Sequence, residues 1–142
     1  MPVYAIDSSV IVAAVLTWHE HHERAHKALE QALQTNNAAL PVHSLVESYS
    51  VMTRLPAPHR LSPQDALAVL EGTFRDNVKL ARLRTRSVWK WLSVTVERGI
   101  AGGRTYDALI LESARSAGAT HLLTLNPRDF RDLDPALEIV EP

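Results

Sequence analysis

The 142-residue sequence predicts an α/β fold, in which helices cover both faces of a mainly parallel central β-sheet. Short apolar runs with strand character alternate with longer segments of helical periodicity, and the connections between successive runs are long enough to hold the helices that parallel strands require. Hydrophobic residues make up 46% of the chain, enough to fill one substantial core. Since the length is also close to the commonest domain size, residues 1–142 are expected to form a single domain.

The predicted elements follow one another in a regular order. Strands are expected at five short apolar runs, residues 3–6, 38–42, 78–83, 121–125 and 137–140. Helices are expected at residues 8–16, 43–55, 63–74, 87–99 and 106–119, and one more around the segment HERAH. The order is a strand and two helices followed by alternating strands and helices, which is typical of a parallel sheet between two helical layers.

Several helix ends carry recognisable signals. Ser62, followed by Pro63 and Asp65, is a helix N-cap with proline at the first helical position. Gly118 stands where the helix before residues 121–125 should end. The segment GIAGG, residues 99–103, is a candidate mobile loop and lacks the lysine and hydroxyl of a phosphate-binding P-loop.

Composition excludes several classes of protein. The chain has no cysteine, so disulfides, thiolate zinc sites and cysteine nucleophiles are excluded and a reducing cytoplasm is the natural compartment. No signal peptide or membrane-spanning run is found in the sequence. Fifteen basic and sixteen acidic residues give a formal net charge of −1, so contact with a polyanion must be local. We therefore expect a soluble cytoplasmic protein.

Polar residues gather where the predicted strands end. Asp7 follows the first strand, Glu47 is expected in the first turn of the helix after the second strand, and Asp107 in the first turn of a late helix. Asn126 and Asp129 follow the run at residues 121–125. Ligands bind outside the carboxyl ends of parallel strands, so these side chains are expected to meet there. Their hard oxygens suit Mg²⁺ or Mn²⁺, which would clamp phosphate.

In this order and spacing the sequence resembles the PIN-domain family, and specifically the VapC-type ribonuclease toxins of toxin-antitoxin pairs. The resemblance is carried by IDSSVIVA near the N-terminus, SLVES after the second strand, YDALI in the late helix, LLTLNPRDF and a terminal IVEP. It covers the chain from end to end.

The resemblance implies a single PIN-like domain and a Mg²⁺-dependent endoribonuclease that uses a metal-activated water. It assigns metal binding to Asp7, Glu47 and Asp107, with Ser9 and Thr124 in support. Where many relatives carry a fourth acid this chain has Asn126, with Asp129 three residues further on. Either could supply the fourth ligand: Asp129 is the candidate catalytic acid and Asn126 a candidate supporting residue. The resemblance also implies an RNA substrate, a VapB-like antitoxin partner and a homodimer.

Each of these acids also has a simpler interpretation as a helix cap. Asp7 could cap the helix that follows it. Glu47 stands three residues after Ser44, so SLVE is also a capping box. Asp107 could favour the positive end of a helix dipole. Capping does not require that all three belong to strand-helix units opening on one edge of a sheet.

The segment HERAH offers a different function. His22, Glu23 and His26 match the H-E-x-x-H pattern, in which two histidines on one helix face bind zinc and the glutamate is a general base. Glu47 could serve as a distal third ligand. The longer metzincin pattern fails, however, and Trp18, Ala25, Leu29 and Leu33 give this helix an ordinary apolar stripe with the histidines at its rim.

A third interpretation is a non-catalytic or receiver-like module, which needs only Asp7 and some neighbours and leaves the other acids unexplained. A phosphatase of the haloacid dehalogenase type would need an aspartate where Ser9 stands. The sequence NPRD further suggests that Asn126 caps a helix with Pro127 at its first position and Asp129 at its third, which would occupy the Asn126 side chain.

RNA contacts are predicted in one basic stretch. Six of the fifteen basic residues fall between residues 75 and 90, with Asp76 the single acid among them. We predict RNA binding by Arg82, Arg84, Arg86 and Lys90. Trp89 and Trp91 beside them could stack on unpaired bases, or equally could lie in the core or in a dimer interface.

Overall fold

The computed structural model describes residues 1–142 and contains one five-stranded sheet. The strands are short: β1 Tyr4–Ile6, β2 Ala38–Pro41, β3 Lys79–Ala81, β4 His121–Leu123 and β5 Glu138–Val140. Their order is β3-β2-β1-β4-β5, and every neighbouring pair is parallel. The α/β class is confirmed, and the sheet is entirely rather than mainly parallel.

Two helices fill each of the connections from β1 to β2, from β2 to β3 and from β3 to β4. The helices are α1 Ser8–Val15, α2 His22–Gln34, α3 Val42–Thr53, α4 Pro63–Phe74, α5 Val88–Glu97 and α6 Arg104–Ser116. Two short 3-10 helices are added, η1 Thr85–Ser87 and η2 Pro127–Asp129. The predicted order, with single helices after the second strand, was therefore wrong, although the helical segments themselves were expected in pairs, at residues 43–55 and 63–74 and at residues 87–99 and 106–119. No helix is long and apolar enough to cross a membrane.

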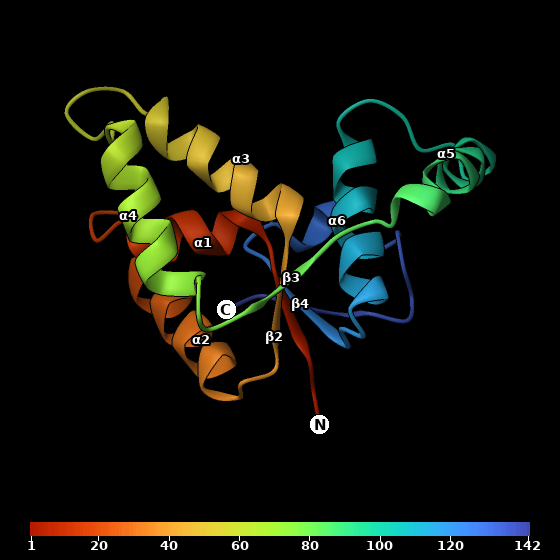
Figure 1. Cartoon of the computed structure of the whole chain (residues 1–142), viewed down its shortest axis with the longest axis horizontal. Coiled ribbons are helices and arrows are strands. Elements are labelled where there is room, and N and C mark those ends of the chain that lie inside the picture. The colour runs from red at the N-terminus through yellow and green to blue at the C-terminus, as the bar shows by residue number, and fades with distance from the viewer.

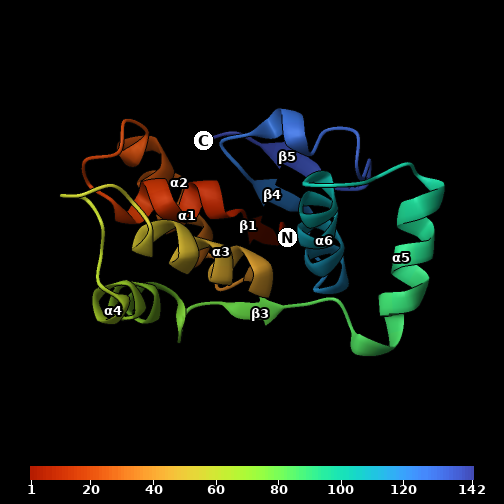
Figure 2. The same ribbon diagram turned by 90° about the horizontal axis from the view of Figure 1, so that it is seen from above.

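Helices cover both faces of the sheet, as predicted (Figures 1 and 2). Successive residues of a strand point to opposite faces, and here Ile6 belongs to a core packed under α1 to α4, whereas Ala5 belongs to a second core under α6. The same alternation separates Leu123 from Leu122 in β4. The central strands are thus sandwiched between two apolar layers.

Two predicted helix ends are confirmed. The hydroxyl of Ser62 accepts a hydrogen bond from the backbone N–H of Asp65 (3.1 Å) at the start of α4. At the end of α6, the N–H of Gly118 donates to Arg115 and the N–H of Ala119 donates to Ala114, which is a Schellman motif. The motif needs a positive φ at its glycine, and Gly118 has φ of +79°.

Two other local predictions were wrong. The helix after β2 begins at Val42, so Ser44 lies inside its first turn and is not the N-cap. Glu47 consequently lies in the second turn of α3, not the first. Trp18 precedes α2 instead of belonging to its apolar stripe, is 48% exposed, and stacks on the His59 ring with centroids 4.2 Å apart.

The strand order reverses direction beside β1. From β1 the chain moves outward through β2 to β3, and it then returns to place β4 on the other side of β1. Such a switch point leaves a crevice outside the carboxyl ends of the two central strands. Asp7 follows β1 and Thr124 follows β4, so both emerge at this point.

Candidate active site

Asp7 is the buried centre of the candidate site. It is 5% exposed, and its Oδ2 accepts hydrogen bonds from the hydroxyls of Ser9 (2.7 Å) and Thr124 (2.8 Å). The Ser9 oxygen in turn accepts from the backbone N–H of Leu125 (3.0 Å), which ties the start of α1 to the segment after β4. The Asp7 side chain makes no capping bond to α1, so helix capping does not explain it.

The environment of Asp7 sets two effects against each other. Burial is the largest and raises its pKa above the usual 3.8, and the charge of Glu47 acts in the same direction. The hydrogen bonds from Ser9 and Thr124 lower the pKa by stabilising the ionised form. A nearby cation stabilises the ionised form of a buried carboxylate that is held in this way.

Glu47 reaches the same region from α3. Its Oε1 accepts a hydrogen bond from the Ser8 hydroxyl, and its Oε2 lies 3.4 Å from Nε2 of His43, one helical turn earlier. The Ser44 hydroxyl is buried and has no hydrogen-bond partner, so the capping box predicted for SLVE is not formed. Glu47 is therefore fixed by a contact with another element, the residue next to Asp7.

Asp107 lies in the first turn of α6, as predicted. Its pKa is raised from 3.8 to about 6, first by desolvation and then by the negative charges of Asp129, Asp7 and Glu47, while Arg104 opposes the rise. Carboxylates influence one another in this way only when they are close together. Four acids from four separate segments of the chain therefore share one electrostatic environment.

The segment after β4 differs from its prediction. Residues Pro127–Asp129 form a short 3-10 helix, and the Asn126 side chain makes no capping hydrogen bond. The backbone carbonyl of Asn126 instead accepts from the N–H of Asp129 (3.1 Å). The expected cap was wrong, so the exposed Asn126 amide is not occupied by the backbone. Asp129 is also exposed, and it is the acid with the largest effect on the pKa of Asp107.

The donor set of this site fits a hard divalent cation. All its candidate ligands are carboxylate oxygens, the type that Mg²⁺ and Mn²⁺ prefer. No group of three or more histidine, aspartate or glutamate side chains is arranged to hold one ion by itself. Mg²⁺ does not need such a cage, because it keeps several waters and commonly binds through one or two carboxylates together with substrate phosphate.

The HERAH segment does not form a comparable site. The His22 and His26 rings stack on each other with centroids 5.4 Å apart, and Nδ1 of His22 is hydrogen-bonded to the Ala13 carbonyl (3.0 Å). Ala25 and Leu29 bury the opposite face of α2 in the core. No third His, Asp or Glu completes a metal site around the two histidines, so Glu47 is not the distal ligand considered from the sequence.

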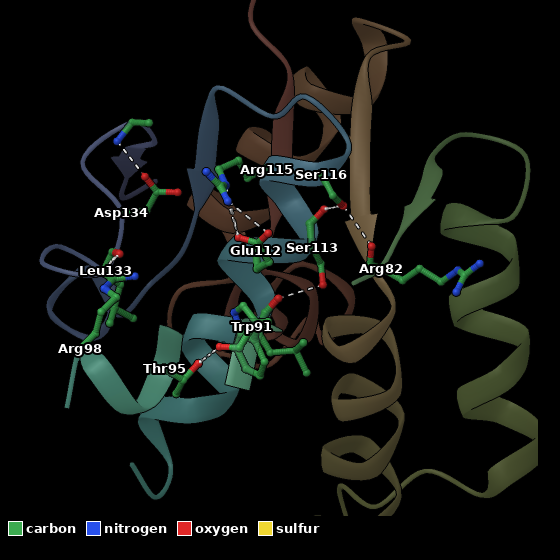
Figure 3. A network of polar contacts seen from close by, with 12 residues as sticks. Arg82, Trp91, Thr95, Arg98, Glu112, Ser113, Arg115, Ser116, Leu133 and Asp134 are labelled. Carbon is green, nitrogen blue, oxygen red and sulfur yellow. Dashed lines mark hydrogen bonds and ion pairs between the residues drawn. The ribbon is translucent and has the colours of Figure 1, made fainter. Parts of the chain in front are cut away.

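Of the predicted RNA-binding residues, Arg82 is tied to the end of α6 that lies far from Asp107, whereas Lys90 lines a cavity together with Ala108, the residue after Asp107. Arg82, Arg84, Arg86 and Lys90 are all exposed, on the segment from β3 to α5. The Arg82 carbonyl accepts a hydrogen bond from the Ser116 hydroxyl at the end of α6, and its guanidinium extends away from that helix (Figure 3). Ser116 is nine residues beyond Asp107, about 13 Å along a helix.

The two tryptophans of this stretch have different surroundings. Trp89 is 83% exposed, whereas Trp91 is half-buried and packs against the core under α6. Trp91, which is labelled in Figure 3, also lines a cavity of about 430 Å³. Only Trp89 is therefore free to meet a partner with most of its ring.

Sequence reasoning missed several neighbours of the acids. Ser8 holds Glu47, His43 lies beside it, and Tyr106 stacks on His43, while Arg104 acts on Asp107. The spacing of His43 and Glu47, four residues apart on one helix, could have indicated their contact. The meeting of His43 with Tyr106 joins two helices and carries no local signal.

The fold and this geometry define a class, an α/β domain with an acidic site at the switch point of a parallel sheet. The model of the PIN domain family matches residues 4–135. Ribonuclease VapC40 of Mycobacterium tuberculosis is 41% identical over 131 residues, covering 92% of this chain and 89% of that protein. Ribonuclease VapC27 of the same organism is 35% identical over 133 residues, covering 94% and 89%. The chain belongs to the PIN-domain family.

Solved structures show the same fold. DNA-bound VapBC2 of Rickettsia felis superposes with a TM-score of 0.69 at 17% identity, covering 99% of this chain and 98% of that one. DNA-bound VapBC of Salmonella typhimurium gives 0.67 at 22% identity with the same coverage. VapC20 of M. tuberculosis, described as a toxin that cleaves the sarcin-ricin loop, gives 0.57 at 17% identity over 84% and 86%.

Proposed function

We propose that this chain is a PIN-domain endoribonuclease, the toxin of a VapBC-type toxin-antitoxin pair, and that it hydrolyses RNA phosphodiesters with the help of Mg²⁺. Two relatives above 30% identity are named ribonucleases. The observation that carries the proposal is the convergence of Asp7, Glu47, Asp107 and Asp129 on one electrostatic environment at the carboxyl edge of the sheet. Mn²⁺ also prefers carboxylate oxygens, and we propose that it can replace Mg²⁺.

In this proposal Asp7, Glu47 and Asp107 hold the cation. When bound, Mg²⁺ supplies a Lewis acid that lowers the pKa of water and offsets the charge growing on the phosphoryl oxygens. The hydroxyls of Ser9 and Thr124 keep Oδ2 of Asp7 in a single orientation, since both donate to it. Ser8 does the same for Oε1 of Glu47. These bonds prepare the carboxylates before substrate arrives.

Asp129 and Asp107 complete the proposed chemistry. Burial and the neighbouring acids raise the pKa of Asp107 to about 6 in the metal-free chain, so near pH 7 its carboxylate is ionised and can take a cation. Asp129 is exposed beside it and is free to orient water or a second cation. Asn126, three residues before Asp129, makes no capping bond with its side chain and is the other candidate for the fourth position. Water attacks the phosphorus, the P–O3′ bond breaks and the 3′-oxygen leaves with a proton, which gives 5′-phosphate and 3′-hydroxyl ends. No 2′,3′-cyclic phosphate forms, because the RNA's own 2′-hydroxyl takes no part.

Sequencing the 5′ ends that appear after induced expression tests the proposal directly. The wild type should generate new 5′-phosphate ends in cellular RNA, and Asp7→Asn should generate none. In purified form the cleavage should stop when EDTA removes divalent cations and return when Mg²⁺ is restored. Cleavage of equal rate in EDTA, or 2′,3′-cyclic phosphate products, would exclude this mechanism.

A protein antitoxin is the proposed partner. The two most similar solved structures described above are VapBC complexes bound to DNA, and the present chain covers nearly all of each matched chain. We propose that a VapB-like protein neutralises this chain in the cytoplasm, and that the chain forms a homodimer. Co-expression with the cognate antitoxin should restore growth and co-purify both proteins, and sedimentation would measure the dimer.

A further inference from the structure

An aromatic pair stands beside the four acids and has no role in the proposed chemistry. The ring of Tyr106, the residue before Asp107, lies parallel to the imidazole of His43, with an interplanar angle of 6° and centroids 5.0 Å apart. The separation and the angle describe an offset stack between α6 and α3. Two rings from different helices are thus held parallel next to the candidate metal ligands.

The pair is fixed on its inner side. The Nε2 atom of His43 is buried, lies 3.4 Å from Oε2 of Glu47 and meets no other polar partner. His43 therefore lies beneath Tyr106 with its Nε2 facing the Glu47 carboxylate. Since Glu47 is itself held by Ser8, the position of the stack relative to Asp7 is set by contacts and not by a flexible loop.

The outer side of the pair is open. Tyr106 is 55% exposed, although the stack with His43 covers one face of its ring, so most of the remaining ring surface is in contact with solvent. Its hydroxyl makes no hydrogen bond within the chain. Burial of a ring stabilises a fold, and this ring is left largely unburied at a site where substrate must lie.

We propose that Tyr106 is a stacking platform for an unpaired nucleobase next to the cleaved phosphodiester, with His43 as its rigid backing. The inference rests on the proposed ribonuclease function and adds the residue that positions the substrate. A base on the outer face would extend the stack, and its phosphate would lie near Asp107, the next residue. Paired bases have no free face to offer, so the platform selects single-stranded RNA.

The charge around the platform suits this ligand. Arg104 is exposed one turn before Asp107 and is close enough to lower the pKa of that carboxyl. It forms no ion pair with a carboxylate in the chain. The Arg104 guanidinium can therefore attract an RNA phosphate while the base of that nucleotide lies on Tyr106.

Fluorescence of 2-aminopurine tests the platform without requiring cleavage. Short single-stranded RNAs, each carrying one 2-aminopurine at a different position, are bound to Asp7→Asn protein, which keeps them intact. Stacking on an aromatic ring quenches the probe. We expect the probe to be quenched at one position when the protein carries Tyr106 or the change Tyr106→Phe. With Tyr106→Ala we expect no quenching at any position. Affinity should fall roughly tenfold in Tyr106→Ala, because stacking is worth several-fold to a hundredfold per base.

Matched variants decide the interpretation. Tyr106→Leu keeps apolar bulk without a π-face and should bind as weakly as Tyr106→Ala, and duplex RNA of the same sequence should not distinguish the variants. Thermal unfolding of each variant checks that the exposed side chain is not needed for folding. Equal affinity and quenching for Tyr106→Ala and Tyr106→Phe would overturn the platform, as would quenching at no position. Failure of wild-type protein to cleave RNA would instead overturn the ribonuclease proposal.

Discussion

The Asp7 carboxylate is stabilised by two hydroxyl donors and destabilised by burial, and burial has the larger effect on its pKa. Because the folded pKa is raised above the unfolded value, ionised Asp7 lowers the free energy of unfolding above about pH 4. An amide of the same shape avoids that effect, and its oxygen can still accept from Ser9 and Thr124. Asp7 is thus needed for metal binding in the proposed mechanism, yet its ionised side chain lowers the stability of the metal-free fold.

We predict that Asp7→Asn lowers the rate of RNA cleavage by a factor of about 100 or more, the range seen when one electrostatic group is removed from an active site. The metal-free variant should be at least as stable as the wild type near pH 7. Cleavage assays and thermal unfolding in EDTA measure the two effects. A variant that unfolds at a much lower temperature would show that Asp7 is structural.

The raised pKa of Asp107 predicts how the free energy of unfolding depends on pH. Its folded pKa of about 6 exceeds the usual aspartate value of 3.8, so between these values the folded state binds more protons than the unfolded state. Metal-free protein should therefore lose stability as pH rises from about 4 to about 6. Asp107→Asn should lose less over this interval, so its melting temperature should exceed the wild-type value near pH 7 and approach it near pH 4. Equal differences at both pH values would contradict this.

The segment after β4 yields a ranking of two variants. Asn126→Ala should change stability by well under the roughly 1 kcal/mol of a lost cap, because the Asn126 side chain caps nothing. Asp129→Asn should weaken Mg²⁺ dependence and cleavage rate more than Asn126→Ala, because Asp129 carries the charge that acts most strongly on Asp107. Titrations of cleavage rate against Mg²⁺ compare them. The reverse order would assign the fourth position to Asn126.

Sequence reasoning located the acids better than their surroundings. Asp7, Asp107 and Asp129 follow strands or open helices, which can be recognised from short stretches. The bond from Ser8 to Glu47 joins residues 39 apart, and no local pattern specifies it. The cap assigned to Asn126 failed because the chain after Pro127 makes only a single 3-10 turn, too short for the helix that the prediction assumed.

At the scale of elements, the packing of α2 indicates whether the HERAH segment forms a metal site. Its buried residues face the core, and the paired histidine rings lie on the rim, where His22 is bonded to a backbone carbonyl of α1. These contacts are those of a packed surface helix. The match to a zinc motif follows from the i and i+4 spacing that any helix gives to two histidines.

We predict that the double change His22→Ala, His26→Ala leaves Mg²⁺-dependent RNA cleavage within a few-fold of the wild type. Loss of the His22 hydrogen bond to Ala13 should lower stability by about 1 kcal/mol. Parallel cleavage assays and denaturant unfolding provide the comparison. Complete loss of activity in a folded double variant would restore a metal role for these histidines.

The start of α3 shows why element boundaries are hard to predict. Ser44 and Glu47 have the spacing of a capping box, yet β2 ends at Pro41 and the helix follows at once. The first turn of α3 buries Ser44, whose hydroxyl has no hydrogen-bond partner. Tertiary packing overrode a local preference worth about 1 kcal/mol.

At the scale of the whole molecule, alternation of strands and helices was enough to predict a parallel sheet between two layers. The order β3-β2-β1-β4-β5 could not be read from any one element, since it depends on which strands pair. That order places β1 and β4 side by side and so brings Thr124 to Asp7. The pairs of helices in the crossovers then carry Glu47 and Asp107 to the same edge. The site is therefore a property of the assembled fold.

Binding of Mg²⁺ should consequently stabilise the whole fold. A ligand that binds only the folded state adds about 2.7 kcal/mol when its free concentration is a hundredfold above its Kd. We predict that Mg²⁺ raises the melting temperature near pH 7, and that the increase shrinks below about pH 6, where protons occupy Asp107 and compete with the cation. The sign follows from the raised pKa, since a protonated carboxyl must release its proton before it binds metal. Asp7→Asn should abolish most of the increase, whereas His22→Ala, His26→Ala should retain it. An increase that survives in Asp7→Asn but disappears in the histidine variant would move the cation from the edge of the sheet to α2.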